Sequence, residues 1–176
     1  MAQTRKTVRD AIVSVLSNTT RGFNVKLSAL AAAYKIDAFA VDWTSGSASV
    51  FQGYLTSADV EVGQLAPDEF CPCGVVIYTT TSEGMALQKP STFSGQIGAC
   101  VDFYIRFREG IEQDNTESIM DAIEDAALSA LYDNAAAWPS NVILSAHVTG
   151  AKEPAQLTGE GWQERLSIQL TFEVTA

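Results

Sequence analysis

The sequence is poor in the residues and motifs through which small enzymes usually act. It has a single histidine, His147, and three cysteines. There is no G-x-S-x-G elbow, no P-loop and no G-x-G-x-x-G turn, so neither an α/β-hydrolase nor a nucleotide-binding enzyme is indicated. The acidic stretches also lack the D-x-D-x-D-G pattern of a calcium loop. Paired acids for glycoside hydrolysis stay open because acids are plentiful, but a structural or assembly protein is favoured over an enzyme.

Positive charge is scarce and unevenly placed. Residues 1–35 carry six basic groups and one acid, whereas the remaining chain carries five basic groups and twenty acids, so the two parts have net charges of +5 and −15. No Lys or Arg occurs between residues 36 and 88. Such an acidic surface repels phosphate backbones, so sequence-specific binding of DNA or RNA is not expected.

Long apolar runs are missing as well. None approaches the roughly 20 residues of a membrane-spanning helix, and the N-terminus has no apolar signal-peptide core. No membrane partner is therefore expected, and an odd number of cysteines favours reduced thiols in a cytoplasm. The 176 residues, 47% apolar and 18% charged, fit one globular domain over 1–176 that needs no disulfide, metal or cofactor.

The hydrophobic periodicity predicts helices at the N-terminus and in the middle of the chain. The first helix should bury Val8, Ile12, Val15 and Leu16 on one face, followed by a turn at 18–22. Asn24 is the expected N-cap of a second helix, whose buried face should carry Leu27, Leu30, Ala31 and Tyr34. A third helix should run from about 114 to 133 and bury Ile119, Ile123, Ala126, Ala127, Ala130 and Leu131.

Strands are predicted at 75–80, 101–107, 141–148 and 166–174. The first is apolar throughout and should be covered on both faces. The others alternate, so that Phe103, Ile105 and Ile168 should be core while Asp102 and Tyr104 lie on a polar face. Val142, Leu144 and Ala146 should share one side, and residues 82–95 and 149–162 should be loops. This order predicts an α+β fold with a mainly antiparallel sheet of about four main strands and helices packed on one face.

Residues 37–70 form a long excursion from this pattern. It mixes Ser, Gly and Asp with isolated aromatic groups, and we predict short strands at about 48–55 and 58–63. A long excursion is usually functional or buried against another chain, although an ordinary β-meander is an equal alternative.

Cys71-Pro72-Cys73 is the stretch that looks most like chemistry. With Cys100 and His147 it would complete a Cys₃His metal site if the strands brought the four together. A hydrolase built on Cys73 or His147 is a further alternative. Buried cysteine is a common core residue, and Pro before an apolar run is a usual strand entry. We therefore expect a strand entry with reduced thiols and no metal.

Three stretches together carry a resemblance to a known family: TVRDAIVSVLSNTTRGFNVKLSALAAAYKI, CPCGVVIYTT and KPSTFSGQIGACVDFYIRFREG. Followed by an acidic helix and a closing β-hairpin, they resemble the tail-terminator and neck proteins of tailed bacteriophages. The C-P-C variant and the 37–70 excursion depart from the family pattern.

The resemblance implies a structural virion protein at the head–tail junction, made in the host cytoplasm. Such subunits form a ring, usually a hexamer, that ends the tail tube and contacts the tube protein and the head connector. Trp43, Phe51 and Tyr54 are candidate contacts with a neighbouring subunit or the tube, with peripheral core as the alternative. Arg5 and Arg9 are candidates for contact with an acidic surface of the next subunit. A tail-tube or head-completion subunit is the nearest alternative.

Overall fold

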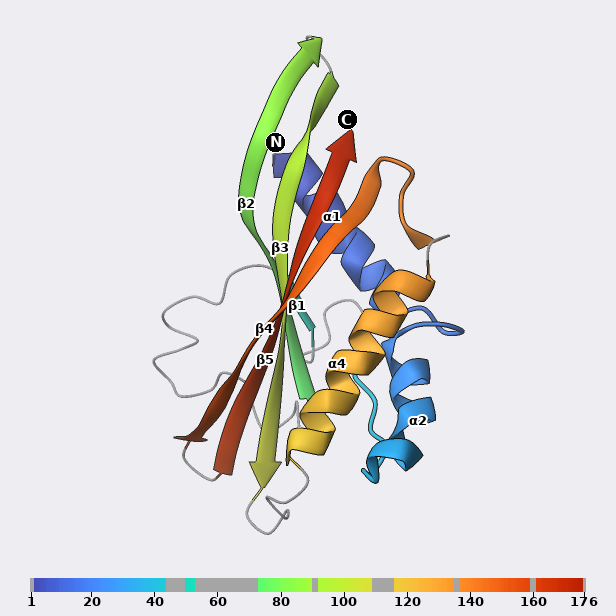
Figure 1. The fold of residues 1–176 in the computed structure, drawn as a ribbon, viewed down its shortest axis with the longest axis vertical. Helices are drawn as coiled ribbons and strands as arrows, with labels where there is room; N and C mark the ends of the chain where they lie inside the picture. Colours follow the sequence, from blue (N-terminus) through green and yellow to red (C-terminus); the bar gives the residue numbers. More distant parts are fainter. Residues whose placement is uncertain are drawn as a thin grey trace.

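The computed structural model describes residues 2–43, 50–52, 73–89, 92–108, 116–134, 137–158 and 161–175. Within these ranges the chain forms three α-helices and five β-strands (Figure 1). The helices are α1 (Ala2–Leu16), α2 (Phe23–Tyr34) and α4 (Thr116–Asp133). The strands are β1 (Val50–Gln52), β2 (Cys73–Lys89), β3 (Thr92–Arg108), β4 (Val142–Thr158) and β5 (Gly161–Thr175).

The strands form one sheet in the order β1-β2-β3-β5-β4. The short β1 pairs with β2 in parallel, whereas the four long strands are antiparallel to their neighbours. All three helices lie on the same side of this sheet (Figure 1). The α+β fold predicted from the sequence, with a four-stranded antiparallel sheet and helices on one face, is confirmed.

The core lies between the helices and the apolar face of the sheet. The register aligns Val75, Phe103 and Leu166 in one row across three strands, and all three are fully buried. Phe23 of α2 stacks on Phe103 with 5.2 Å between ring centroids. The predicted core residues Phe103, Ile105 and Ile168 are all fully buried, so the alternation fixed the buried face of β3 and β5.

The apolar faces of the helices were also predicted well. The four α1 residues expected to be buried are buried, as are five of the six in α4: Ile123, Ala126, Ala127, Ala130 and Leu131. Ile119 is partly buried against the same core. In α2, Leu27 and Ala31 are buried while Leu30 and Tyr34 are half-buried. Period 3.6 in the sequence therefore located the helix surfaces that face the sheet.

The strands are longer than their periodicity indicates. β2 continues to Lys89 and β3 begins at Thr92, so most of the predicted loop at 82–95 is strand. β4 likewise continues to Thr158, and β5 begins at Gly161, where a loop was expected. Backbone pairing forms these extensions, with irregular register after Thr79 and after Thr149. A strand held mainly by its ladder leaves no alternating pattern to read.

The predicted excursion at 37–70 lies largely outside the described residues. β1 falls within the strand predicted at 48–55 but has only three residues. The strand predicted at 58–63 lies outside the described residues.

The turn between α1 and α2 forms as predicted, but the helix after it begins differently. Asn18 Oδ1 accepts hydrogen bonds from the backbone N–H groups of Thr20 and Arg21, each at 3.0 Å. Gly22, not Asn24, is the N-cap of α2. The Asn24 amide instead bonds both backbone groups of Val41, at 2.8 and 2.9 Å. Asn24 thus holds the chain that follows α2 against the helix.

Gly22 is sterically required in this turn. A Cβ at this position would lie 2.3 Å from the carbonyl oxygen of Asn18 and 2.5 Å from that of Leu16. Both contacts are with backbone, so only a shift of the turn relieves them. We expect Gly22→Ala to lower the free energy of unfolding by about 2 kcal/mol, measured by urea denaturation. Ser28→Ala, at an exposed position of α2, is the control and should change little. Equal stability of the two variants would contradict the steric argument.

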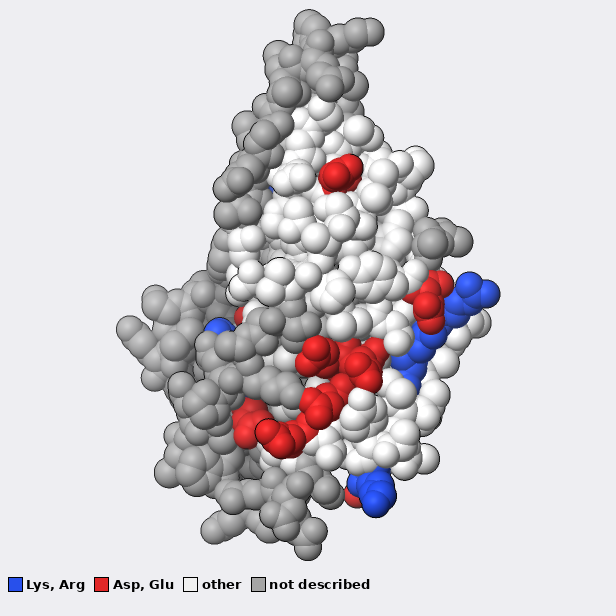
Figure 2. All heavy atoms as spheres, in the orientation of Figure 1, with Lys and Arg blue, Asp and Glu red and all other residues white. Residues whose placement is uncertain are grey.

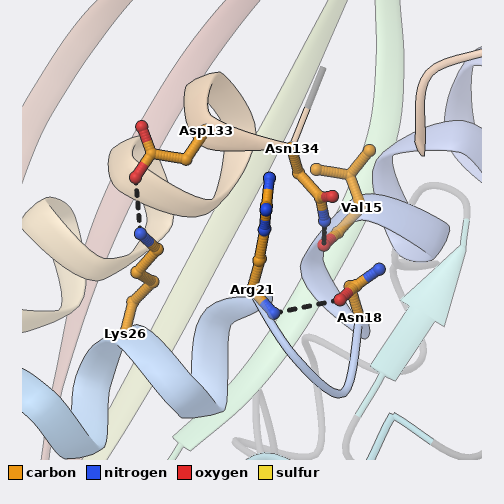
Figure 3. A network of polar contacts seen from close by, with 6 residues as sticks. All are labelled: Val15, Asn18, Arg21, Lys26, Asp133 and Asn134. Atoms are coloured by element: carbon orange, nitrogen blue, oxygen red, sulfur yellow. Dashed lines mark hydrogen bonds and ion pairs between the residues drawn. The ribbon is translucent and has the colours of Figure 1, made fainter. Parts of the chain in front are cut away.

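Polar contacts tie this turn to the end of α4 (Figure 3). The buried side chain of Asn134 donates a hydrogen bond to the carbonyl oxygen of Val15 at 3.2 Å. Lys26 of α2 pairs with Asp133 at 2.5 Å, and this contact holds the pKa of Asp133 below its usual value. The C-terminal end of α4 is therefore fixed to both N-terminal helices.

Candidate functional site

A polar cluster is buried on the sheet face that points away from the helices. Asp102 of β3 is only 1% exposed, and Cys100 lies beside it on the same face. The Asp102 carboxylate accepts hydrogen bonds from the Tyr78 hydroxyl at 3.2 Å and from the Cys100 thiol at 3.2 Å. Arg165 of β5 adds a longer ion pair, at 3.9 Å. The alternation predicted one buried and one polar face for β3, but Asp102 and Tyr104 of the polar face are buried as well.

In this cluster, two protonated groups, Cys100 and Tyr78, surround the carboxylate of Asp102. Burial raises the pKa of the Cys100 thiol. Burial also raises the pKa of Tyr78, and hydrogen bonding to Cys100 and the negative charge of Asp102 raise it further. Both groups therefore stay protonated near neutral pH and donate to Asp102 rather than act as nucleophiles.

The two described cysteines and the histidine proposed for a metal site do not converge. Cys73 lies on the helix side of β2, opposite Ile105, whereas Cys100 lies on the other face of the sheet. His147 lies on the helix side of β4, several rows from Cys73, beside Leu170. Cys71 lies outside the described residues. Among the residues that are described, no three potential metal ligands cluster.

The two described thiols should be almost unreactive in the folded protein. Cys73 is buried, and burial raises its pKa strongly, so little thiolate forms at neutral pH. In a Cys71→Ser background, we expect a thiol-specific chromogenic disulfide to label Cys73 and Cys100 slowly in buffer and rapidly in denaturant. Fast labelling of Cys73 in the folded protein would show that its burial is wrong. It would also revive the hydrolase alternative.

A bulge at Ser145 changes the direction of the β4 side chains. Val142 and Leu144 pair opposite Val174 and Phe172, but Ala146 then pairs with Thr171 and His147 with Leu170. The prediction that Ala146 shares a side with Val142 and Leu144 is therefore wrong, and His147 takes that side. Its Nδ1 lies 2.6 Å from the hydroxyl of Tyr132 in α4, and the two rings meet edge to face.

The outer edge of β4 exposes apolar side chains. β4 ends the sheet, and Ile143 and Val148 are 59% and 63% exposed on the face away from the helices. Tyr132 is 47% exposed on the helix side. Residues 142–148 contain no acid, Lys, Arg or Pro, which are the usual means of blunting an edge strand. We call Tyr132, Ile143, His147 and Val148, with the strand backbone beside them, the β4 edge. Its uncharged run was visible in the sequence, but its edge position was not.

The three aromatic residues predicted as intersubunit or tube contacts lie in different parts of the chain. Trp43 is half-buried and packs edge to face on Phe23 at 6.0 Å. Phe51 lies in β1 opposite Val76. Tyr54 lies outside the described residues.

Arg5 and Arg9 of α1, predicted to contact the next subunit, both make contacts within their own subunit. Arg9 is half-buried and donates to the Thr79 hydroxyl at 3.4 Å. Arg5 is also half-buried and interacts within the chain. Lys6 is exposed and pairs with Asp10 at 2.5 Å. Arg9 therefore serves the packing of α1 on β2, and Lys6 is the basic side chain of α1 that reaches furthest into solvent.

α4 carries an acidic surface. Its 18 residues include five acids and no base: Glu117, Asp121, Glu124, Asp125 and Asp133. Figure 2 shows acidic side chains gathered on the face of the molecule that carries α4. Tyr34 of α2 donates a hydrogen bond to Asp125, and this contact is the main reason its pKa is raised to about 12.

No helix in the described part of the chain is long and apolar enough to cross a membrane. Comparisons with known proteins leave the family open. No protein-family model matches the sequence, and no curated protein is significantly similar to it.

Proposed function

We propose that this protein is a structural virion subunit of a tailed bacteriophage. In this proposal it forms a ring at the head–tail junction, ends the tail tube and joins it to the head connector. The proposal combines the resemblance in the sequence with one structural observation, the apolar β4 edge. Of the four large apolar side chains exposed among the described residues, Tyr132, Ile143 and Val148 belong to this edge.

The β4 edge supports an assembly function because exposed edges and apolar side chains are costly in a monomer. A row of unpaired backbone groups beside exposed Ile and Val attracts other strands, so natural proteins usually blunt or cover it. Here neither a charged side chain nor a proline protects residues 142–148. A subunit that functions in contact with others would bury this surface.

The charge of the chain also fits a ring through which DNA passes. With a net charge of −10, and α4 carrying five acids without a base, the subunit repels a phosphate backbone. A conduit should let DNA slide without gripping it. The work of such a ring is mechanical, needing no cofactor, and Trp43, Phe51 and Tyr54 remain candidates for contact with a neighbour or the tube.

Mass measurement and imaging test the proposal. We expect light scattering after size exclusion to give a mass of about six subunits, and negative-stain images to show closed rings. The rings should bind one end of tail tubes made from the tube protein of the same virus. Long tubes formed by the protein alone would instead identify a tail-tube subunit. Particles that bind heads but not tubes would identify a head-completion subunit.

A further inference from the structure

We infer that copies of this chain join edge to edge. The outer edge of β4 in one copy pairs with the outer edge of β2 in the next, so that one antiparallel sheet continues from subunit to subunit. The closed ring rests on the proposed function, whereas the pairing of the two edges rests on the sheet itself.

Both ends of the sheet offer backbone for such pairing. β4 is the last strand on one side. On the other side, β1 pairs with β2 only from Val75 to Ile77. Over residues 80–89, no described strand lies on the outer side of β2. Within the described strands, one copy therefore has an unpaired edge on each side, which is what a head-to-tail contact requires.

Strand direction decides how the edges meet. β2, β3, β5 and β4 alternate in direction, so β4 runs opposite to β2. Copies placed in the same orientation around an axis therefore bring β4 against β2 as an antiparallel pair, the more stable arrangement. Pairing of β4 with a second β4 would instead give a two-fold dimer and leave both β2 edges uncovered.

The part of β4 that is open to pairing is short. Its second half contains Lys152, Glu153 and Pro154, so the unprotected edge is residues 142–148. Seven residues span roughly 23 Å at about 3.3 Å per residue, and a sheet with its side chains is roughly 10 Å thick, so pairing covers on the order of 230 Å² on each copy. This total is well below the ~1,000 Å² that a biological interface needs, so most of the buried area must come from the helices beside the two edges.

The helices add complementary charge to this contact. α1 packs over β2 and β3, and α4 over β5 next to β4, so head-to-tail pairing brings α4 of one copy towards α1 of the next. α1 contains Arg5, Lys6 and Arg9 against a single acid, Asp10, so it is net positive even though Arg9 contacts Thr79 and Lys6 pairs with Asp10. α4 contains five acids and no base. This attraction opposes the general repulsion between subunits of net charge −10 and favours one orientation.

Replacing the exposed apolar side chains with charged ones tests the interface. We expect the double variant Ile143→Lys/Val148→Lys to stay folded, because both side chains point to solvent, and to be monomeric by light scattering. Val25→Lys is the matched control, since Val25 is also an exposed apolar residue, 40% exposed, but lies on α2. The control should assemble like the wild type. Wild-type assembly should weaken as salt rises, and salt-insensitive assembly would contradict the α1–α4 contact.

Hydrogen exchange gives a second test that needs no variant. Backbone amides of 142–148 and 80–89 should exchange more slowly in the assembled protein than in dilute monomer. Protection of 142–148 alone, in a dimer, would indicate β4–β4 pairing and overturn the inference. Rings that persist in the double variant would overturn it too, while leaving the proposed function standing. Open chains that depend on the β4 edge would support the inference but contradict the closed ring of the proposed function. A wild-type chain that is monomeric at every concentration would contradict the edge contact.

Discussion

Replacing Phe103 with Asp should abolish folding of the subunit. The ring of Phe103 is fully buried, stacks on Phe23 at 5.2 Å and lies between Val75 and Leu166 in the register of the sheet. Removing such a ring costs about 3–5 kcal/mol, and a carboxylate in its place adds the cost of desolvating a charge. The sum is comparable with the whole stability of a typical domain, about 5–15 kcal/mol.

The expected readouts are the loss of near-ultraviolet circular dichroism, the loss of a cooperative thermal transition and aggregation during purification. Phe103→Leu is the control that separates volume from charge, and it should fold with a loss of about 1–2 kcal/mol. A soluble Phe103→Asp variant with wild-type spectra would mean that β3 turns its other face to the helices.

The sequence predicted best the elements that bury one regular face. The spacing of Val8, Ile12 and Leu16 in α1 indicates a surface that packs against the core. The alternation of Leu166 and Ile168 with polar residues in β5 does the same. Burial on one side imposes a period, and a period can be read without the structure. The fold class followed from these periods and the order of elements.

The sequence predicted poorly whatever depends on pairing between strands. The extension of β2 through residues 82–89 follows its pairing with β3, and no alternation in the sequence indicates it. The extra residue at Ser145 turns Ala146 and His147 to the faces opposite to those predicted, and nothing in the sequence around them marks it. Register and bulges arise between strands distant in sequence, so one strand does not encode them alone.

The candidate surfaces show the same division. The acids of α4 were evident from the sequence, whereas the position of β4 at the end of the sheet needs the topology. Trp43 was singled out as an isolated aromatic in a polar stretch, and its packing on Phe23 fits the peripheral-core alternative without testing a contact with another subunit. Asp102 was assigned only to a polar face, because alternation cannot distinguish a solvated polar face from a buried polar cluster.

Asp102→Ala should therefore be strongly destabilising, although the residue lies on the face of the sheet away from the helices. We expect it to lower the free energy of unfolding by about 3 kcal/mol, measured by urea denaturation. The variant removes the acceptor of the Tyr78 hydroxyl and the Cys100 thiol and leaves a gap in a buried site. The Arg165 contact contributes less, because it is 3.9 Å long and the Arg165 side chain is about one-third exposed.

Two further variants separate charge from hydrogen bonding at this site. Asp102→Asn keeps an oxygen acceptor and should lose less stability than Asp102→Ala. If the cluster is a structural network, Asp102→Leu combined with Arg165→Met should recover much of the loss, because an apolar pair fills the site without burying a charged carboxylate. Wild-type stability of Asp102→Ala would show that the carboxylate contributes nothing to folding. The burial of Asp102 on this face would then need an explanation other than stability, and the face would become a candidate functional surface.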